Sequence, residues 1–287
     1  MSADGPDPDE LRAAVRDRWT RSADGWRARH ERFQRATMGV SRWMLDAIEP
    51  QPGQRIVELA AGVGELGFLA AELIEPGGTL ICSDGAEAML EHARKRAADL
   101  GLRNVEFKPL DLEWIDLSAA AVDAALCRWG YMFALDRGAA LRETRRVLRP
   151  GGRLALAAWT EPQRNPFAAI PRQALFEAGL IDSFGGEGPG MFDLADPVAL
   201  RTLLEDTGFG EILVEEVELV MPYDDVDDFW AMTSDLSGQF GDLVATLNEL
   251  QRNDLRERIA AALSPYEQPD GGGLRLPAAA LVAAAEG

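Results

Sequence analysis

Short apolar runs alternate with helix-like stretches between residues 51 and 159. The runs predict buried strands at 56–59, 79–83, 105–107, 122–127 and 154–159. Between them, apolar residues recur at helical spacing, as in the stripe from Met89 to Leu100. Strands that alternate with helices are typical of a parallel sheet covered by helices on both faces. We therefore expect an α/β core in which the first strand is central and all strands end at one ligand-binding edge.

The rest of the chain adds helices and two further strands. A helical pattern covers 10–48, with a possible break at Asp24-Gly25 and a second helix around Trp43. The pattern then predicts strands at 212–221 and 276–284. Together these features predict a Rossmann-like, seven-stranded, mostly parallel sheet with a helical cap. The expected parts are an N-terminal helical lid (1–50), a cofactor-binding core (51–159), a loop-rich cap segment (160–195) and a C-terminal part of the core (196–287) with a helical insert (224–263).

Charge narrows the range of partners. The chain has 48 acidic and 29 basic residues, a formal net charge of −19, which argues against a nucleic-acid partner. No apolar run approaches the length of a membrane span, so we expect no membrane partner. The first residues, MSADGPDPDE, lack the apolar core of a signal peptide, and we expect a cytoplasmic enzyme. The sequence leaves the oligomeric state open.

Metal chemistry is not expected. Cys82 and Cys127 both fall within apolar, strand-like runs, and His30 and His92 lie on separate helical segments. A metal site needs several such ligands close together. We therefore predict two buried free thiols and no metal.

The stretch RIVELAAGVGELG, residues 55–67, combines a strand, a small-residue turn and a helix start. Missing side chains in such a turn let a ligand approach the backbone, and the first helix amides point toward it. Glu58 lies inside the apolar strand, where an unpaired carboxylate is costly, so we expect it to have a partner, which a ligand could supply. The glycine spacing, with Asp84 downstream, also matches a dinucleotide fingerprint, which keeps an NAD(P)-dependent oxidoreductase as an alternative.

Five blocks in order favour another family. They are VELAAGVGELG, SDGAEAML, PLDLEWIDL, VDAALCRWGYMF and RRVLRPGGRLAL. Together they resemble the class I S-adenosylmethionine-dependent methyltransferases, most closely the ubiquinone and menaquinone C-methylase type. The chain departs from the family at Ala60, where glycine is usual, and at Ala86, where serine is usual. A Tyr-x-x-x-Lys pair, expected for one class of oxidoreductase, is absent from the sequence.

The resemblance implies S-adenosyl-L-methionine as cofactor and S-adenosyl-L-homocysteine as product. It assigns the loop to the methionine moiety, Asp84 to the ribose, and Asp111 with Leu112 to the adenine. The implied cofactor-binding residues are Glu58, Ala60, Gly62, Gly64, Asp84, Gly85, Met89, Asp111, Leu112, Cys127 and Arg128. Arg128 would repel the sulfonium unless its guanidinium turns away or pairs with an acid.

Substrate choice is expected outside residues 51–159, in segments rich in aromatic residues. We expect a small, mainly apolar methyl acceptor, enclosed by Trp26, Trp129, Tyr131, Phe192, Tyr223 and Trp230. The sequence does not say which acceptor atom is methylated or whether a general base is used. Weak candidates for a base are His30, Tyr131, Asp193 and Tyr223. A third possibility is a relative that binds the same cofactor without transferring a methyl group.

Overall fold

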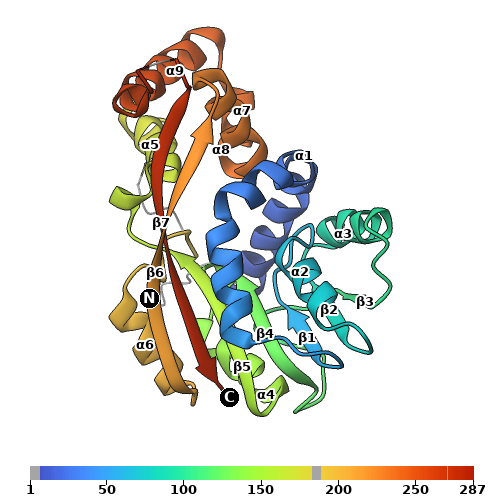
Figure 1. The fold of residues 1–287 in the computed structure, drawn as a ribbon. Helices are drawn as coiled ribbons and strands as arrows, with labels where there is room; N and C mark the ends of the chain where they lie inside the picture. Colours follow the sequence, from blue (N-terminus) through green and yellow to red (C-terminus); the bar gives the residue numbers. More distant parts are fainter. Residues whose placement is uncertain (1–6, 183–188, 270) are drawn as a thin grey trace, which may run out of the picture.

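The structure is a computed structural model and describes residues 7–182, 189–269 and 271–287. Its centre is a seven-stranded sheet in the order β3-β2-β1-β4-β5-β7-β6 (Figure 1). The strands are β1 (Arg55–Glu58), β2 (Thr79–Ser83), β3 (Val105–Lys108), β4 (Val122–Arg128), β5 (Leu148–Trp159), β6 (Gly210–Tyr223) and β7 (Leu274–Glu286). The first five pair in parallel, and β7 runs antiparallel to both of its neighbours. The predicted fold class is therefore confirmed.

Helices cover both faces of this sheet (Figure 1). The helices α2 (Leu66–Leu73), α3 (Glu87–Asp99) and α4 (Arg137–Val147) connect successive strands. From β1 to β3 the chain steps along the sheet in one direction, and right-handed crossovers therefore place α2 and α3 on one face. From β4 to β5 it steps in the opposite direction, which places α4 on the other face. The helix α6 (Pro197–Asp206) packs against α4 and β6. Asp196 caps α6 by accepting the N–H groups of Val198 and Ala199.

The N-terminal segment forms one helix instead of two. The helix α1 runs from Pro8 to Ile48, with Asp7 as its N-cap, and continues through Asp24-Gly25. A Cβ atom at Gly25 would lie 2.0 Å from the carbonyl oxygen of Asp235, so the glycine here permits a close approach between α1 and the helix α7 (Val226–Leu236). Tertiary packing of α1 against β5, β6, β7 and α3 outweighs the local cost of a glycine inside a helix.

The remaining helices gather beyond the carboxyl end of β5. They are α5 (Pro166–Glu177), α7 (Val226–Leu236), α8 (Gly238–Thr246) and α9 (Glu249–Leu263). Short 3₁₀ turns occupy Tyr131–Phe133, Pro162–Arg164 and Ser264–Tyr266. Figure 1 shows these helices together at one end of the molecule, above the two long strands β6 and β7. Part of the 160–195 segment, residues 183–188, lies outside the described residues. No helix in the described ranges is long and apolar enough to cross a membrane.

Candidate active site

The loop between β1 and α2 is shaped by left-handed backbone conformations. Ala60, Gly62 and Gly64 have φ angles of +51°, +56° and +78°. A Cβ atom added at Gly62 would meet no heavy atom within 4 Å, whereas one at Gly64 would lie 2.4 Å from the ring of Phe68. Glycine at position 64 thus allows the helix to pack tightly against the loop, and Gly62 leaves an open approach to the backbone.

Asp84, directly after β2, ties this loop to the next one. Its Oδ2 accepts the Gly62 N–H at 2.8 Å, and its Oδ1 accepts the Ala86 N–H at 2.9 Å. The residue is only 9% exposed, and burial raises the pKa of its carboxyl while the two N–H groups lower it. A carboxylate has about four acceptor positions, so two remain for hydroxyl groups of a ligand. Asp84 therefore fits the expected ribose-binding role.

Glu58 has a partner inside the protein. Its Oε2 accepts the Gly67 N–H at 2.9 Å, and the side chain lies beneath the loop, 3% exposed. A Cβ atom at Gly67 would lie 2.3 Å from this oxygen, so glycine is required for the contact. Burial is the main cause that raises the pKa of Glu58 to about 8. Its partner is thus the first turn of α2, and no ligand is needed to satisfy this oxygen.

Arg128, the last residue of β4, is neutralised by an acid that the sequence analysis missed. Its guanidinium pairs with Glu65 and donates to Ser41 Oγ at 2.9 Å and to Thr37 Oγ1 at 3.3 Å. Both members of the Arg128–Glu65 pair are almost fully buried. The repulsion expected between Arg128 and a sulfonium is therefore offset. Part of this arrangement has a signal in the sequence. Thr37 and Ser41 are four residues apart, so their hydroxyls lie on one face of α1, which is otherwise apolar.

Arg96 on α3 is a second missed residue. Its Nη1 donates to the Gly64 carbonyl oxygen at 2.7 Å, and its guanidinium carbon lies 5.3 Å from the centre of the Phe68 ring. Burial lowers the pKa of Arg96, and Glu65 and Glu58 oppose that shift. Arg96 holds the loop between β1 and α2 from the side of α3. The residues near position 96 in the sequence do not predict this role.

Glu113 joins three segments around the expected adenine end. Its Oε1 accepts the N–H groups of Leu135 and Asp136 at 2.6 and 3.1 Å. Its Oε2 accepts Arg12 Nη2 of α1 at 2.6 Å and Arg12 Nε at 3.1 Å. In turn, Asp111 Oδ1 accepts the N–H of Glu113 at 2.8 Å. The loop that carries Asp111 is thereby tied to α1 and to the start of α4.

An aromatic row crosses the carboxyl edge of the sheet from α1 to β5. Trp26, Phe33 and Trp129 meet edge to face, with ring centres 5.0 and 5.2 Å apart. Trp129 then stacks flat on Trp159 at 4.6 Å with an interplanar angle of 2°. Trp129 also has a φ of +60°, which is rare for a bulky residue and typical of functional sites.

The N-terminal half of α1 packs against loops at the carboxyl edge of the sheet. Trp19 packs against a buried cluster formed by Ala23, Val63, Ala86 and Met89, and its ring centre lies 5.1 Å from that of Phe133. Its neighbours therefore come from segments that follow β1, β2 and β4. Met89 belongs to this cluster, so the packing of Met89 on a ligand ring remains a prediction.

The other expected cofactor residues lie along the same edge. A Cβ atom at Gly85 would lie 3.8 Å from Arg16 Cγ of α1. A Cβ atom at Gly130 would lie 3.8 Å from Leu112 Cδ1 and 2.7 Å from Cys127 Sγ. Cys127 is fully buried, and burial raises the pKa of its thiol to about 12, so it acts as a small apolar residue. Cys82 is likewise a buried free thiol.

Three of the expected acceptor-site residues lie in other packing contacts. The Tyr131 hydroxyl and the Thr144 hydroxyl form a 2.6 Å hydrogen bond in the core beside α4, where burial raises the pKa of Tyr131 well above its usual value. Tyr223 is buried against Phe229, and Trp230 packs against Phe240. These contacts attach α7 to β6 and α8. The Tyr131 hydroxyl is engaged by Thr144 in the core, and the roles of Tyr131 and Tyr223 as candidate bases stay predictions.

The remaining candidates have contacts of their own. Phe192 is partly buried against the main core. Asp193 forms an ion pair with Arg137 and accepts the Gly190 N–H at 3.1 Å. His30 Nδ1 lies 2.7 Å from the carbonyl oxygen of Arg27 in its own helix. None of these contacts assigns a catalytic role. Among the described residues, no group of three or more His, Cys, Asp or Glu side chains is placed to hold a metal ion.

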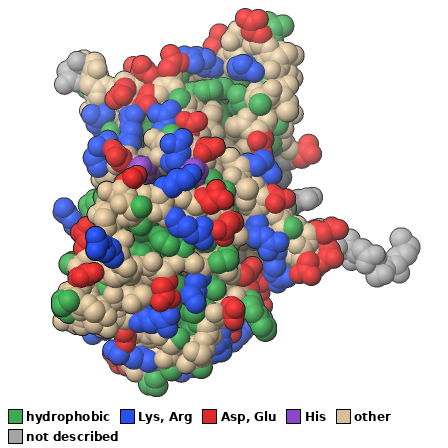
Figure 2. All heavy atoms as spheres, turned by 90° about the vertical axis from the view of Figure 1, so that its right-hand side faces the viewer, with side chains coloured by type: hydrophobic (Ala, Val, Ile, Leu, Met, Phe, Trp, Pro, Cys, Tyr) green, Lys and Arg blue, Asp and Glu red, His purple; other side chains and the backbone are tan. Residues whose placement is uncertain are grey.

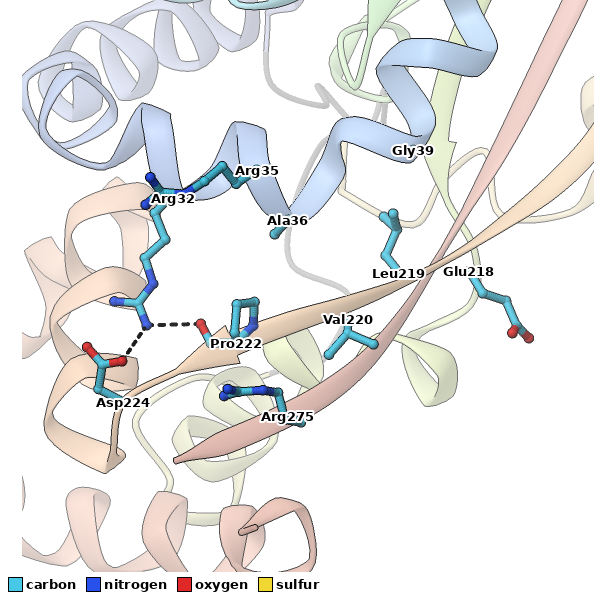
Figure 3. Close-up of a pocket in the computed structure, with 10 residues that line it drawn as sticks. All are labelled: Arg32, Arg35, Ala36, Gly39, Glu218, Leu219, Val220, Pro222, Asp224 and Arg275. Atoms are coloured by element: carbon cyan, nitrogen blue, oxygen red, sulfur yellow. Dashed lines mark hydrogen bonds and ion pairs between the residues drawn. The ribbon is translucent and has the colours of Figure 1, made fainter. Parts of the chain in front are cut away.

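A groove of about 800 Å³ lies elsewhere, between α1 and the β6–β7 pair (Figure 3). Arg32 on its wall donates to the Pro222 carbonyl oxygen at 3.1 Å and pairs with Asp224 and Asp228. In Figure 3, Glu218 points away from the groove. None of the residues that line it is among the predicted site residues. Arg32 is thus paired within the chain, whereas Arg35 on the same wall has no ion-pair or hydrogen-bond partner among the described residues.

Ala60 and Gly130 form a tight pair that can be tested. A Cβ atom at Gly130 would lie 2.6 Å from the Ala60 Cβ, and Ala60 itself has a left-handed backbone. We expect Gly130→Ala to destabilise the protein by roughly 1–3 kcal/mol through overpacking. The cost should be about 1 kcal/mol smaller in an Ala60→Gly background, which removes one clashing methyl group. Urea unfolding of the single and double variants measures this coupling.

Gly210→Ala is a matched control, since an added Cβ there meets nothing within 4 Å. Strictly additive effects of Ala60→Gly and Gly130→Ala would contradict the contact.

Comparisons with known proteins agree with this geometry. Residues 56–152 match the methyltransferase domain family. The ubiquinone/menaquinone biosynthesis C-methyltransferase UbiE of Escherichia coli O1:K1 is 27% identical over 181 residues, which cover 60% of this chain and 72% of that protein.

Solved structures share the fold. The YcgJ protein of Bacillus subtilis superposes with a TM-score of 0.56 at 17% identity, covering 86% of this chain and 97% of that one. The [4+2]-cyclase SpnF superposes with a TM-score of 0.52 at 17% identity, covering 86% of this chain and 79% of that one. The ordered sequence blocks, the fold and the domain match together identify the chain as a class I S-adenosylmethionine-dependent methyltransferase, similar to the UbiE C-methyltransferases, with its methyltransferase domain at residues 56–152.

Proposed function

We propose that this enzyme transfers the methyl group of S-adenosylmethionine to a small, mainly apolar molecule bound beside the aromatic row. The observation that carries the proposal is the position of Trp129. This residue directly follows Arg128 at the end of β4, and its ring lies in the row that joins α1 to β5. Flat aromatic walls with few polar groups are typical of pockets for apolar molecules.

The cofactor would be held by residues of three strand ends. Asp84 would accept the ribose hydroxyls with its two remaining acceptor positions, and Asp111 and the Leu112 N–H would face the adenine. Gly62 leaves its backbone open to the methionine moiety. Glu58 and Arg96 act as positioning residues, because their contacts are to Gly67 and Gly64 of the loop.

The bound cofactor supplies an activated methyl group, which leaves its sulfonium by in-line displacement. The protein then has to align the acceptor and exclude water. Trp129 would orient a flat acceptor, because stacking on the buried Trp159 holds its ring rigid. The helix α1 would exclude water by covering the loop with Trp19. Ion pairing of Arg128 with Glu65 would keep an uncompensated positive charge away from the sulfonium.

We assign no general base. His30, Tyr131, Asp193 and Tyr223 remain sequence-based candidates, and a base is needed only if the acceptor must lose a proton. The two alternatives can be separated by experiment. An NAD(P)-dependent oxidoreductase would bind the nicotinamide cofactor. The second alternative is a relative without methyl transfer; SpnF, which shares the fold, is a [4+2]-cyclase.

A nucleic-acid substrate is not part of the proposal. The formal net charge is −19. On the face shown in Figure 2, basic and acidic side chains are interspersed, without the basic stripe that a phosphate backbone requires.

The proposal is tested first by ligand-induced stabilisation. S-adenosylhomocysteine at about 100 times its dissociation constant should raise the free energy of unfolding by roughly 2.7 kcal/mol, while NAD should have no effect. Thermal unfolding with each ligand measures this difference. Incubation with methyl-labelled cofactor and a panel of apolar acceptors should then give a product heavier by one methyl group. Equal stabilisation by NAD would contradict the cofactor, and cofactor binding without label transfer to any acceptor would favour the non-transferring relative.

A further inference from the structure

The strand β6 forms one edge of the sheet, and the groove of Figure 3 lies along this edge. Within the described ranges, β7 is the one strand that pairs with β6. The groove has a volume of about 800 Å³, and α1 borders it across from β6. An edge strand with a cavity beside it offers unpaired backbone groups to another chain.

The backbone of β6 turns hydrogen-bonding groups toward this free edge. Ala279 of β7 lies opposite Glu218. Ala279 bonds on its far side, where it donates its N–H to Asn165 Oδ1 and accepts the Thr160 N–H, both at 3.1 Å. In an antiparallel pair, such a residue and the residue opposite it turn their backbone groups away from each other. The N–H and C=O groups of Glu218, and of Val220 two residues on, therefore face the free edge.

Pro222 shows the same direction at the next outward position, and it places α1 beside the edge. Its carbonyl oxygen accepts Arg32 Nη2 at 3.1 Å, and Arg32 in turn pairs with Asp228. This end of the edge is therefore closed by a side chain whose charge is satisfied. Within the described ranges no strand lies on this side of β6, so the backbone groups of Glu218 and Val220 are left for water or for a partner.

Two arginines that line the groove, Arg35 and Arg275, form no ion pair with any described residue. Arg275 donates to a backbone carbonyl oxygen of its own strand at 2.9 Å. A Cβ atom at Gly39 would lie 3.8 Å from Leu219 Cδ2, so α1, with Arg35 one turn away, borders the face of β6 that carries Leu219. The register places Arg275 on the other face, with Val220, as Figure 3 shows. The two unpaired charges therefore lie on opposite faces of the same edge.

The acidic side chains of the edge strand are already paired. Glu216 and Glu218 both pair with Arg164, the latter at 3.5 Å, and Glu218 points away from the groove (Figure 3). The charges left for a partner are thus the two positive ones of Arg35 and Arg275. The formal net charge of −19 opposes an acidic partner only weakly at physiological ionic strength, because exposed charges more than about 8 Å apart are largely screened.

We propose that an extended, acidic peptide segment of a partner protein adds to β6 as an eighth strand of the sheet. Its backbone pairs with Glu218 and Val220. Because the side chains of a strand alternate between two faces, two neighbouring acidic residues reach Arg35 on one face and Arg275 on the other. A single small anion, held on one face, meets only one of them. The inference goes beyond the proposed function and does not depend on which methyl acceptor binds.

A folded second copy of this chain fits the edge less well than a single extended segment. In each copy α1 borders the edge, as the contact of Arg32 with Pro222 shows. Two paired β6 strands would lie about 4.8 Å apart, whereas packed helices need about 8–10 Å between their axes. The two copies of α1 would therefore compete for one space.

The test uses the fluorescein-labelled peptide VTEEVTV on the full-length enzyme, with VTQQVTV as an uncharged probe of the same shape. Fluorescence anisotropy gives the dissociation constant of each peptide. We expect the wild type to bind VTEEVTV about tenfold more tightly than VTQQVTV, since two exposed ion pairs contribute about threefold each. Arg35→Gln and Arg275→Gln should each weaken binding of VTEEVTV by about threefold. Arg42→Gln, which removes an exposed charge of α1 outside the groove lining, is the matched control and should bind like the wild type.

Strand addition is tested separately at Val220. Its N–H faces the edge, so Val220→Pro removes a donor from the edge and leaves the pairing with β7 in place, as Pro222 does two residues away. This variant should weaken binding of VTEEVTV by at least about tenfold. Val220→Thr keeps the N–H and the branched shape, and should bind like the wild type. An unchanged dissociation constant for S-adenosylhomocysteine shows that each variant is folded.

Absence of an anisotropy change in the wild type up to about 1 mM VTEEVTV overturns the proposal. Equal binding of the two peptides overturns the acidic class of the partner, and unaltered binding to Val220→Pro overturns strand addition. Sedimentation of the wild type as a dimer that Val220→Pro converts to a monomer shows that a second copy occupies the edge, which also overturns the proposal. None of these outcomes concerns methyl transfer, so each of them leaves the proposed function standing.

Discussion

Asp84→Asn is expected to weaken binding of S-adenosylhomocysteine by roughly 100-fold, about 2.7 kcal/mol. The wild-type carboxylate accepts one N–H from each of two loops, at 2.8 and 2.9 Å. An asparagine has one acceptor oxygen, so its amide N–H₂ must face the N–H of either Gly62 or Ala86. The variant therefore loses a charged acceptor for the ribose and also the contact that holds the loop in place.

Isothermal titration with S-adenosylhomocysteine measures the loss. Asp206→Asn, an exposed carboxylate at the end of α6, is the matched control and should bind like the wild type. The unfolding temperature of Asp84→Asn without ligand should stay within a few degrees of the wild-type value. An affinity within threefold of the wild type would show that the ribose is held by another group.

Glu58→Gln is expected to stabilise the protein at alkaline pH and to have little effect at acidic pH. Burial raises the pKa of Glu58 in the folded state to about 8, from an ordinary value of 4.5. A raised acid pKa means that the folded state holds a proton that the unfolded state releases. The resulting stability is fully present below about pH 4.5 and is lost as the pH rises through about 8.

Glutamine keeps the shape and an acceptor for the Gly67 N–H, but it cannot ionise. Between about pH 5.5 and about pH 9, the free energy of unfolding of Glu58→Gln should gain roughly 3 kcal/mol relative to the wild type. Urea unfolding across this range measures the difference. Glu91→Gln, at an exposed position on α3, controls for the general effect of removing one negative charge. A difference that does not change with pH would mean that Glu58 is ionised throughout and stabilised by Arg128.

Two features of the structure that local spacing does not predict have a common cause. Local spacing suggested two N-terminal helices, but contacts of α1 with strands far along the chain stabilise one continuous helix. Tyr131 follows β4 closely, as an acceptor-site residue should, yet its hydroxyl turns into the core and bonds to Thr144. Which way a side chain turns after a strand depends on the neighbouring helix, here α4, and that neighbour is set by the whole fold.

The sequence by itself determined the order of strands and helices in the core (55–159), the Gly62–Gly64 turn, and the acids that follow β2 and β3. These features are local: apolar periodicity defines the elements, and small residues define the turn. Only the tertiary structure decided that Glu58 is bound by Gly67, that Glu65 neutralises Arg128, and that Glu113 joins α1 to the adenine side. The tertiary structure also decided that Trp26 and Trp129, far apart in the sequence, both pack against the ring of Phe33. Such pairings join residues up to about a hundred positions apart, and their energies depend on burial, which no local pattern of residues specifies.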